Sequence, residues 1–170
     1  MAGSLILIDS DTASTSASIS LTGISSTYDV YLCVLSGITP TADANFNMRV
    51  TTSGTADSDS QYDKASEVFK VDSSFGTTSD ENEAQWRINS TVGTDTNEEA
   101  NHTIYLFNFS NASEYSMYTN ESVKLNSSGG VEGYQGGGAH TVAEANDGVN
   151  FFFTSGTIES GEFKLYGLRK

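Results

Sequence analysis

The sequence predicts an all-β protein, an antiparallel β-sandwich with jelly-roll-like connections and about ten strands. Apolar residues recur at every second position in several segments, as in Ala17, Ile19 and Leu21 between serines. This is the spacing of a strand with one buried face. Helical periodicity is nearly absent. The apolar segments are separated by stretches rich in Gly, Ser, Asn and Asp, which are typical of turns.

Ten segments have the composition and length of strands. They cover residues 5–9, 16–22, 30–35, 46–51, 67–71, 84–88, 103–109, 115–123, 149–153 and 162–166. The first is an apolar run, the second alternates apolar residues with serine, and the third consists of core-type residues around Cys33. The fourth alternates Phe46, Met48 and Val50 with polar residues. The fifth also fits a helix over 61–71, but turn residues on both sides favour a strand.

The later segments follow the same rule. In the sixth, Trp86 and Ile88 share one face, so we expect them in the core rather than in a sugar-stacking site. The seventh and eighth carry tyrosines that we expect to pack within the protein or at an interface. In the ninth, Val149, Phe151 and Phe153 share one face, opposite Asn150 and Phe152. The tenth, around Phe163, is predicted to lie in the interior of a sheet.

Polar and glycine-rich stretches are expected to form loops. Residues 51–61, 72–83 and 93–101 are predicted to be exposed connections that would carry any recognition. Residues 129–138 are predicted to be a glycine-rich surface loop, without the Lys-Ser/Thr and following helix of a phosphate-binding loop. Tyr134 at its centre either packs onto its own domain or contacts a partner.

Length and charge limit the class of protein. A chain of 170 residues fits one jelly-roll-like domain, residues 1–170, with residues 1–12 as a possible assembly segment. The formal net charge of −14 would repel phosphate backbones and anionic membranes, so neither nucleic acid nor membrane is expected as a partner. The N-terminus has no basic region and only a short apolar run, unlike a secretory signal.

Few residues suggest a metal site or a catalytic site. Acidic residues alternate at Asp57, Asp59 and Asp63, a spacing with which a loop can surround calcium. The loop lacks the central glycine and closing glutamate of a calcium-binding loop, so we expect it simply to be solvated, and we predict no metal and no cofactor. His102 and His140 are the only histidines, and neither lies in a catalytic motif, so we predict no enzyme activity.

The N-terminal apolar run predicts an assembly element. Leu5, Ile6, Leu7 and Ile8 are consecutive, and a run without alternation is typical of a strand buried on both faces. We therefore expect it to pack into a neighbouring subunit or under the sandwich at the base of a trimer. The chain contains a single Pro, so its strand edges are poorly guarded, which favours self-association, most simply as a homotrimer.

Several motifs together resemble one group of proteins. These are Ser-Thr-Tyr-Asp-Val-Tyr-Leu at 26–32, Gly-Gly-Gly-Ala-His-Thr-Val-Ala at 136–143, Asp-Gly-Val-Asn-Phe-Phe-Phe at 147–153, and Gly-Glu-Phe-Lys-Leu-Tyr-Gly-Leu-Arg at 161–169. The chain resembles small virion structural proteins, tail-fibre-like or head-decoration-like, of tailed phages of marine bacteria, including those of cyanobacteria. The resemblance extends over most of the chain, and its motifs are structural rather than catalytic.

The resemblance implies a non-enzymatic protein on the virion surface. A head decoration, or cement, protein is the first expectation, because the sequence contains no heptad shaft and no repeat with which a fibre could reach a receptor. Its partners would be copies of itself and the major capsid protein. The alternative is a tail fibre or receptor-binding tip, with tail proteins and host surface glycans as partners. A third possibility is a carbohydrate-binding jelly roll.

Overall fold

A computed structural model describes residues 4–72 and 74–169, and these residues form thirteen strands. The strands are β1 (Leu5–Ser16), β2 (Ile19–Thr22), β3 (Val30–Pro40), β4 (Ala44–Thr52), β5 (Thr55–Ala56), β6 (Tyr62–Lys70), β7 (Phe75–Glu83), β8 (Trp86–Val92), β9 (Ala100–Phe107), β10 (Tyr115–Leu125), β11 (Val131–Ala143), β12 (Gly148–Phe153) and β13 (Ile158–Leu168). The described residues contain no helix long and apolar enough to cross a membrane.

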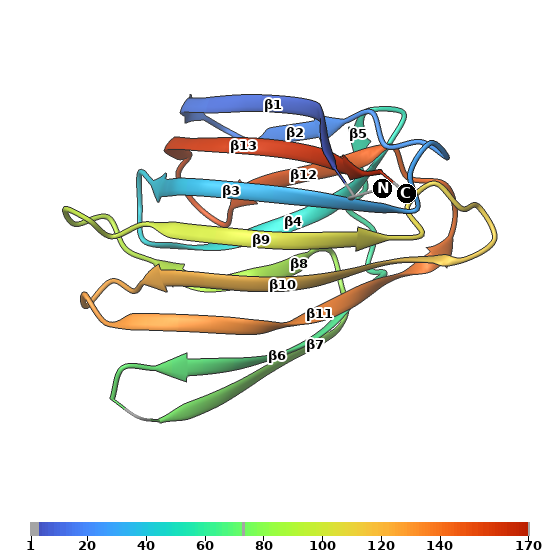
Figure 1. The fold of residues 1–170 in the computed structure, drawn as a ribbon. Coiled ribbons are helices and arrows are strands. Elements are labelled where there is room, and N and C mark those ends of the chain that lie inside the picture. Colours follow the sequence, from blue (N-terminus) through green and yellow to red (C-terminus); the bar gives the residue numbers. More distant parts are fainter. Residues whose placement is uncertain (1–3, 73, 170) are drawn as a thin grey trace.

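Two antiparallel sheets pack face to face, with the larger one in front in Figure 1. The large sheet has eight strands in the order β1-β13-β3-β9-β10-β11-β6-β7, and the small sheet has the order β2-β12-β4-β5, with β8 also paired to β4. In the consecutive pairs β1–β2, β3–β4, β8–β9 and β12–β13 the two members belong to different sheets. The chain therefore crosses repeatedly between layers, as in a jelly roll. The predicted all-β sandwich is confirmed.

The core lies between the sheets and is rich in aromatic residues. Phe46 on β4 packs against Phe151 and Phe153 on β12, with ring centroids 6.0 and 4.8 Å apart. Phe151 also contacts Phe163 on β13 of the large sheet, at 5.6 Å. Trp86, predicted to be in the core, is fully buried. Cys33 is also buried, and burial raises the pKa of its thiol above the usual range. These residues occupy alternate positions because each strand turns one face inward.

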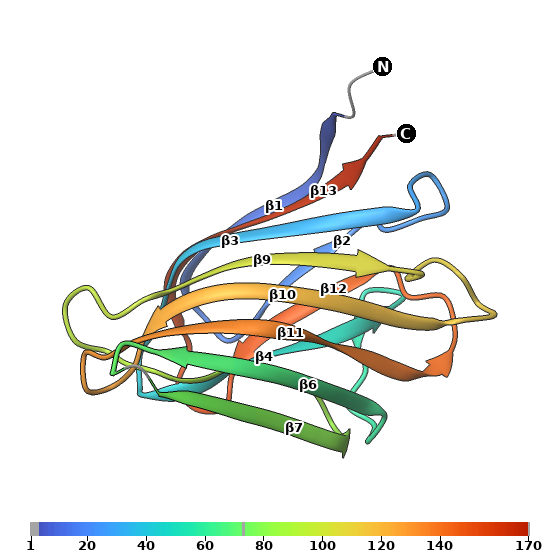
Figure 2. The same cartoon turned by 60° about the horizontal axis from the view of Figure 1, so that its bottom comes forward.

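The predicted strands are largely confirmed, and the C-terminal one lies between β1 and β3 in the interior of the large sheet (Figure 2). The first predicted strand was too short, because β1 continues to Ser16 as it pairs with β13. Two predicted loops are wrong. Residues 72–83 contain the edge strand β7, and residues 129–138 form most of the long strand β11. Residue 73, which belongs to the predicted loop 72–83, lies outside the described residues.

The glycines of β11 serve close packing rather than a turn. A Cβ at Gly138 would lie 2.4 Å from the carbonyl oxygen of Asp63 and 2.9 Å from Nε1 of Trp86. The indole of Trp86, from the small sheet, lies under β11, where its Nε1 donates to the carbonyls of Asp63 and Ala139, both at 3.2 Å. Only a residue without a side chain fits over the indole.

Candidate functional site

The outer face of the large sheet carries an apolar surface. It lies at the end of the sheet near the two termini, whose position Figure 1 shows. Strand register aligns its residues in rows, because residues directly opposite each other point to the same side of a sheet. One row follows the pairs Leu7–Tyr166, Tyr166–Leu32 and Leu32–Tyr105 across β1, β13, β3 and β9. A second contains the pairs Leu5–Leu168, Val30–Phe107 and Phe107–Met117. We call these nine residues the apolar face.

The apolar face is partly open to solvent, both at the β1 edge and on the central strands β9 and β10. Leu5 is 50% exposed and Leu7 53%, Met117 is 44% exposed and Tyr105 38%. The inward neighbours on the same strands, such as Leu106 on β9, belong to the core. A depression in the apolar face is lined by Ser4, Leu5, Leu32, Tyr105, Leu168 and Arg169. The surface therefore has both large apolar side chains and a hollow into which a partner's side chain can pack.

The structure corrects one part of the N-terminal prediction. Leu5 and Leu7 point outward, whereas Ile6 and Ile8 are half-buried and Ile8 packs against the core. The run therefore alternates, and burial on both faces under its own sandwich is wrong. Packing into a neighbouring subunit stays a prediction, and residues 1–3 of the predicted assembly segment lie outside the described residues.

Tyr134 packs within its own domain, one of the two alternatives for this residue. It lies on β11 and is buried, and its hydroxyl bonds to Ser90 on β8 and donates to Oε2 of Glu132 at 3.1 Å. Glu132 also pairs with the buried Nζ of Lys124 at 2.8 Å. Burial raises the pKa of the Tyr134 hydroxyl, so it stays protonated. Tyr134 is part of a buried polar network, and contact with a partner is wrong.

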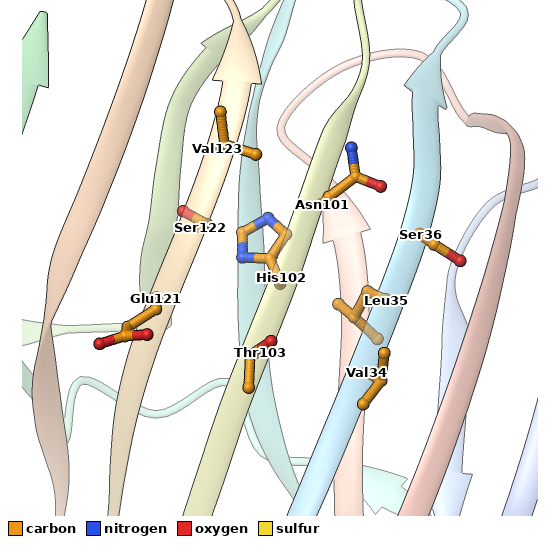
Figure 3. Close-up of a pocket in the computed structure, with 9 residues that line it drawn as sticks. All are labelled: Val34, Leu35, Ser36, Asn101, His102, Thr103, Glu121, Ser122 and Val123. Carbon is orange, nitrogen blue, oxygen red and sulfur yellow. The ribbon is translucent and has the colours of Figure 1, made fainter.

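A shallow, more polar depression adjoins the apolar face on β3, β9 and β10 (Figure 3). Val34, Thr103 and Glu121 lie next to one another across these strands. Below them lies the buried imidazole of His102, whose Nδ1 bonds to Oδ1 of Asn120 at 2.9 Å. Burial lowers the pKa of His102 to about 4, so the ring is neutral near pH 7. It therefore acts as a packing group under the depression.

The three acidic residues considered as weak calcium candidates, Asp57, Asp59 and Asp63, do not form one group. Oδ1 of Asp57 accepts from the backbone of Asp59 at 2.9 Å, while Asp63 on β6 accepts from the backbone of Asn82 at 2.8 Å. Asp57 instead contacts His140, whose Nε2 lies 3.1 Å from Oδ2. The sequence does not indicate this contact. It predicts a loop at 129–138, whereas in the structure His140 lies inside β11.

Comparisons with known proteins add no relative. No family model, curated protein or solved structure matches the chain significantly. Function therefore has to be argued from the surfaces and side chains of this molecule.

Proposed function

We propose that this chain is a non-enzymatic structural protein of a tailed-phage virion, displayed on the particle surface as a head decoration protein. The observation that carries the proposal is the apolar face at the β1 edge, where Leu5 and Leu7 are half-exposed. On a chain with a net charge of −14, such a surface is a place for protein contact. The resemblance of the sequence motifs to virion proteins supports the same assignment.

Self-association explains both the apolar face and the edge beside it. β1 is the first strand of the large sheet, so its outer edge presents unpaired backbone groups. A head-to-tail contact can place the edge of one copy on the apolar face of the next, and three such contacts close a ring. We therefore propose a homotrimer, in which the apolar face is buried and the acidic remainder faces solvent. The trimer would then sit on the major capsid protein.

The side chains offer little for catalysis. The imidazole of His102 is buried and neutral, and its hydrogen bond is to an amide. His140 pairs with carboxylates. Among residues 4–72 and 74–169, no hydrogen bond joins a histidine to a serine, threonine or cysteine side chain, the contact that an activated nucleophile needs. These contacts favour a structural role.

Copy number on purified particles tests the proposal. A decoration protein should be present in amounts on the order of hundreds per virion, comparable with the major capsid protein, because it follows the symmetry of the shell. Quantitative mass spectrometry of purified virions measures this ratio. A few tens of copies would assign the protein to the tail, as a fibre or receptor-binding tip. Its absence from virions would overturn the proposal.

Glycan binding is the second candidate, and one observation favours it. The exposed ring of Tyr105 adjoins Thr103 and the Glu121–Gln135 pair, in which Nε2 of Gln135 donates to Glu121 at 3.2 Å. An aromatic platform beside hydrogen-bonding groups is a common design for binding sugars. Glu121→Gln separates the two functions, because it should weaken glycan binding on an array and leave self-association unchanged. Binding to no glycan would eliminate this candidate.

A further inference from the structure

A buried histidine lies between two carboxylates at one end of the sandwich. His140, on β11, has a fully buried side chain, and its Nε2 lies 3.1 Å from Oδ2 of Asp57, which directly follows β5. Its Nδ1 lies 3.9 Å from Oε1 of Glu144, which directly follows β11. One ligand atom from each of the three residues falls within 4.8 Å of the others. Two segments, the end of β11 and the residue after β5, thus bring a nitrogen and two carboxylates together.

The hydrogen bonds leave one imidazole nitrogen unsatisfied. An ionised carboxylate only accepts, so the contact with Asp57 places the proton on Nε2 of His140. Nδ1 then carries a lone pair, and it is buried with no hydrogen-bond partner among the described residues. The nearest charged atom is Oε1 of Glu144, which also carries lone pairs. A buried unsatisfied nitrogen is destabilising, so a positive species between Nδ1 and Glu144 would be stabilising.

No basic side chain supplies that charge in the described part of the chain. The ion pairs formed there by Lys and Arg involve Asp80, Glu132 and Glu162, not Asp57 or Glu144. The group therefore has two carboxylates and no paired cation.

The surroundings hold the imidazole in place. The ring of Tyr62 packs against His140 with centroids 4.9 Å apart, and its hydroxyl donates to the backbone carbonyl of Asp57 at 2.8 Å. The hydroxyl of Thr52 donates to Oε1 of Glu144 at 3.4 Å. The group is thus positioned by packing and hydrogen bonds before any ligand arrives.

We propose that His140 and Glu144 bind a divalent transition-metal ion of the zinc class between Nδ1 and the carboxylate, while Asp57 holds the proton on Nε2. The imidazole nitrogen favours zinc over calcium, which prefers oxygen ligands alone. Tetrahedral zinc places N and O ligands about 3.3 Å apart, so the 3.9 Å separation must close by a small rotation of Glu144. The side chain of Glu144 is 34% exposed and is free to make it, and water completes the coordination.

Zinc titration of the full chain tests the site. After chelator treatment and dialysis, isothermal titration calorimetry with Zn²⁺ should show one equivalent bound per chain. NMR of the imidazole nitrogens should show that zinc changes the chemical shifts of His140 and leaves those of His102 unchanged. Glu144→Gln should weaken binding by at least tenfold, and Asp57→Asn by about 10–100-fold through loss of the hydrogen bond that orients the imidazole. Asp59→Asn is the matched control, and it should bind as the wild type does.

Three outcomes would overturn the proposal. The first is the absence of saturable zinc binding. The second is binding that Glu144→Gln leaves unchanged, which would indicate non-specific attraction to an acidic surface. The third is calcium binding in preference to zinc. Because Glu144 lies at the surface, its variant should fold, so the test does not depend on replacing the buried histidine. None of these outcomes bears on the virion role, which rests on the apolar face.

Discussion

Replacing the two outermost leucines of the apolar face should disrupt self-association and leave the fold intact. The double variant Leu5→Thr/Leu7→Thr removes apolar surface at the β1 edge and introduces β-branched residues, which are suited to a strand. Both side chains point outward and about half of each is exposed, so neither belongs to the core. Exposed substitutions of this kind change stability by about 0.5 kcal/mol. The variant therefore separates assembly from folding.

The size of the effect follows from the exposed fractions. Complete burial of a leucine side chain is worth about 1.5–3 kcal/mol, so burying the remaining half contributes about 1 kcal/mol. Leu5 and Leu7, which are 50% and 53% exposed, together contribute about 2 kcal/mol to each contact between subunits. This corresponds to an affinity weakened by about 30-fold per contact, before any loss of shape complementarity.

Sedimentation velocity across a range of protein concentrations measures the change. The double variant should shift from trimer to monomer at concentrations where the wild type is assembled. Val71→Thr/Phe75→Thr is a matched control, because it removes two exposed apolar residues at the opposite edge of the large sheet. Unchanged association of the Leu5/Leu7 variant would refute the assignment of the interface. If the control lost self-association to the same extent, the contact between subunits would not be specific to the β1 edge.

Three further perturbations test the fold. Folding lowers the pKa of His102 from 6.5 to about 4, so the unfolded chain binds the proton at a higher pH than the folded chain does. The free energy of unfolding should therefore decrease by about 3 kcal/mol as the pH falls from about 6.5 to 4. In urea titrations, His102→Gln should remove this decrease. Gly138→Ala should cost about 1–3 kcal/mol through overpacking, whereas Gly133→Ala, whose Cβ would meet nothing closer than 3.7 Å, should be tolerated in thermal unfolding. Lys124→Met should cost about 3–5 kcal/mol, because it leaves the Glu132 carboxylate without its cation, and adding Glu132→Gln should recover much of that loss of unfolding free energy.

The sequence predicted strands wherever apolar residues alternate over a polar background. The alternation around Phe46 and Phe151 identified β4 and β12, because each of these strands has one face in the core. β7 was not predicted, because it is an edge strand whose side chains are mostly polar and exposed. Its pairing with β6 comes from backbone hydrogen bonds, which leave no mark in hydropathy.

β11 was missed for a different reason. Its glycines suggest a loop by composition, since glycine lowers the tendency to form a strand. In the structure Gly136, Gly137 and Gly138 are each so close to a neighbouring strand that a Cβ would lie 2.4–2.5 Å from a backbone oxygen. Close packing against the neighbouring strands, and at Gly138 also against the Trp86 indole, therefore overrides local preference. No rule applied to residues 129–138 alone could indicate where that indole lies.

The interaction surface was predictable only in its residues, not in its extent. Residues 5–8 form an unbroken apolar run in the sequence, so no alternation separates Leu5 and Leu7 from Ile6 and Ile8. Register, which depends on the pairing of distant segments, decides that Leu7 is followed across the sheet by Tyr166, Leu32 and Tyr105. An isolated exposed leucine is ordinary on a protein surface, whereas such a row next to an open sheet edge is not. The proposed partner contact therefore depends on the topology of the large sheet. A change that shifts the β1–β13 register by one residue would turn Leu5 and Leu7 inward and remove the apolar face without altering its composition.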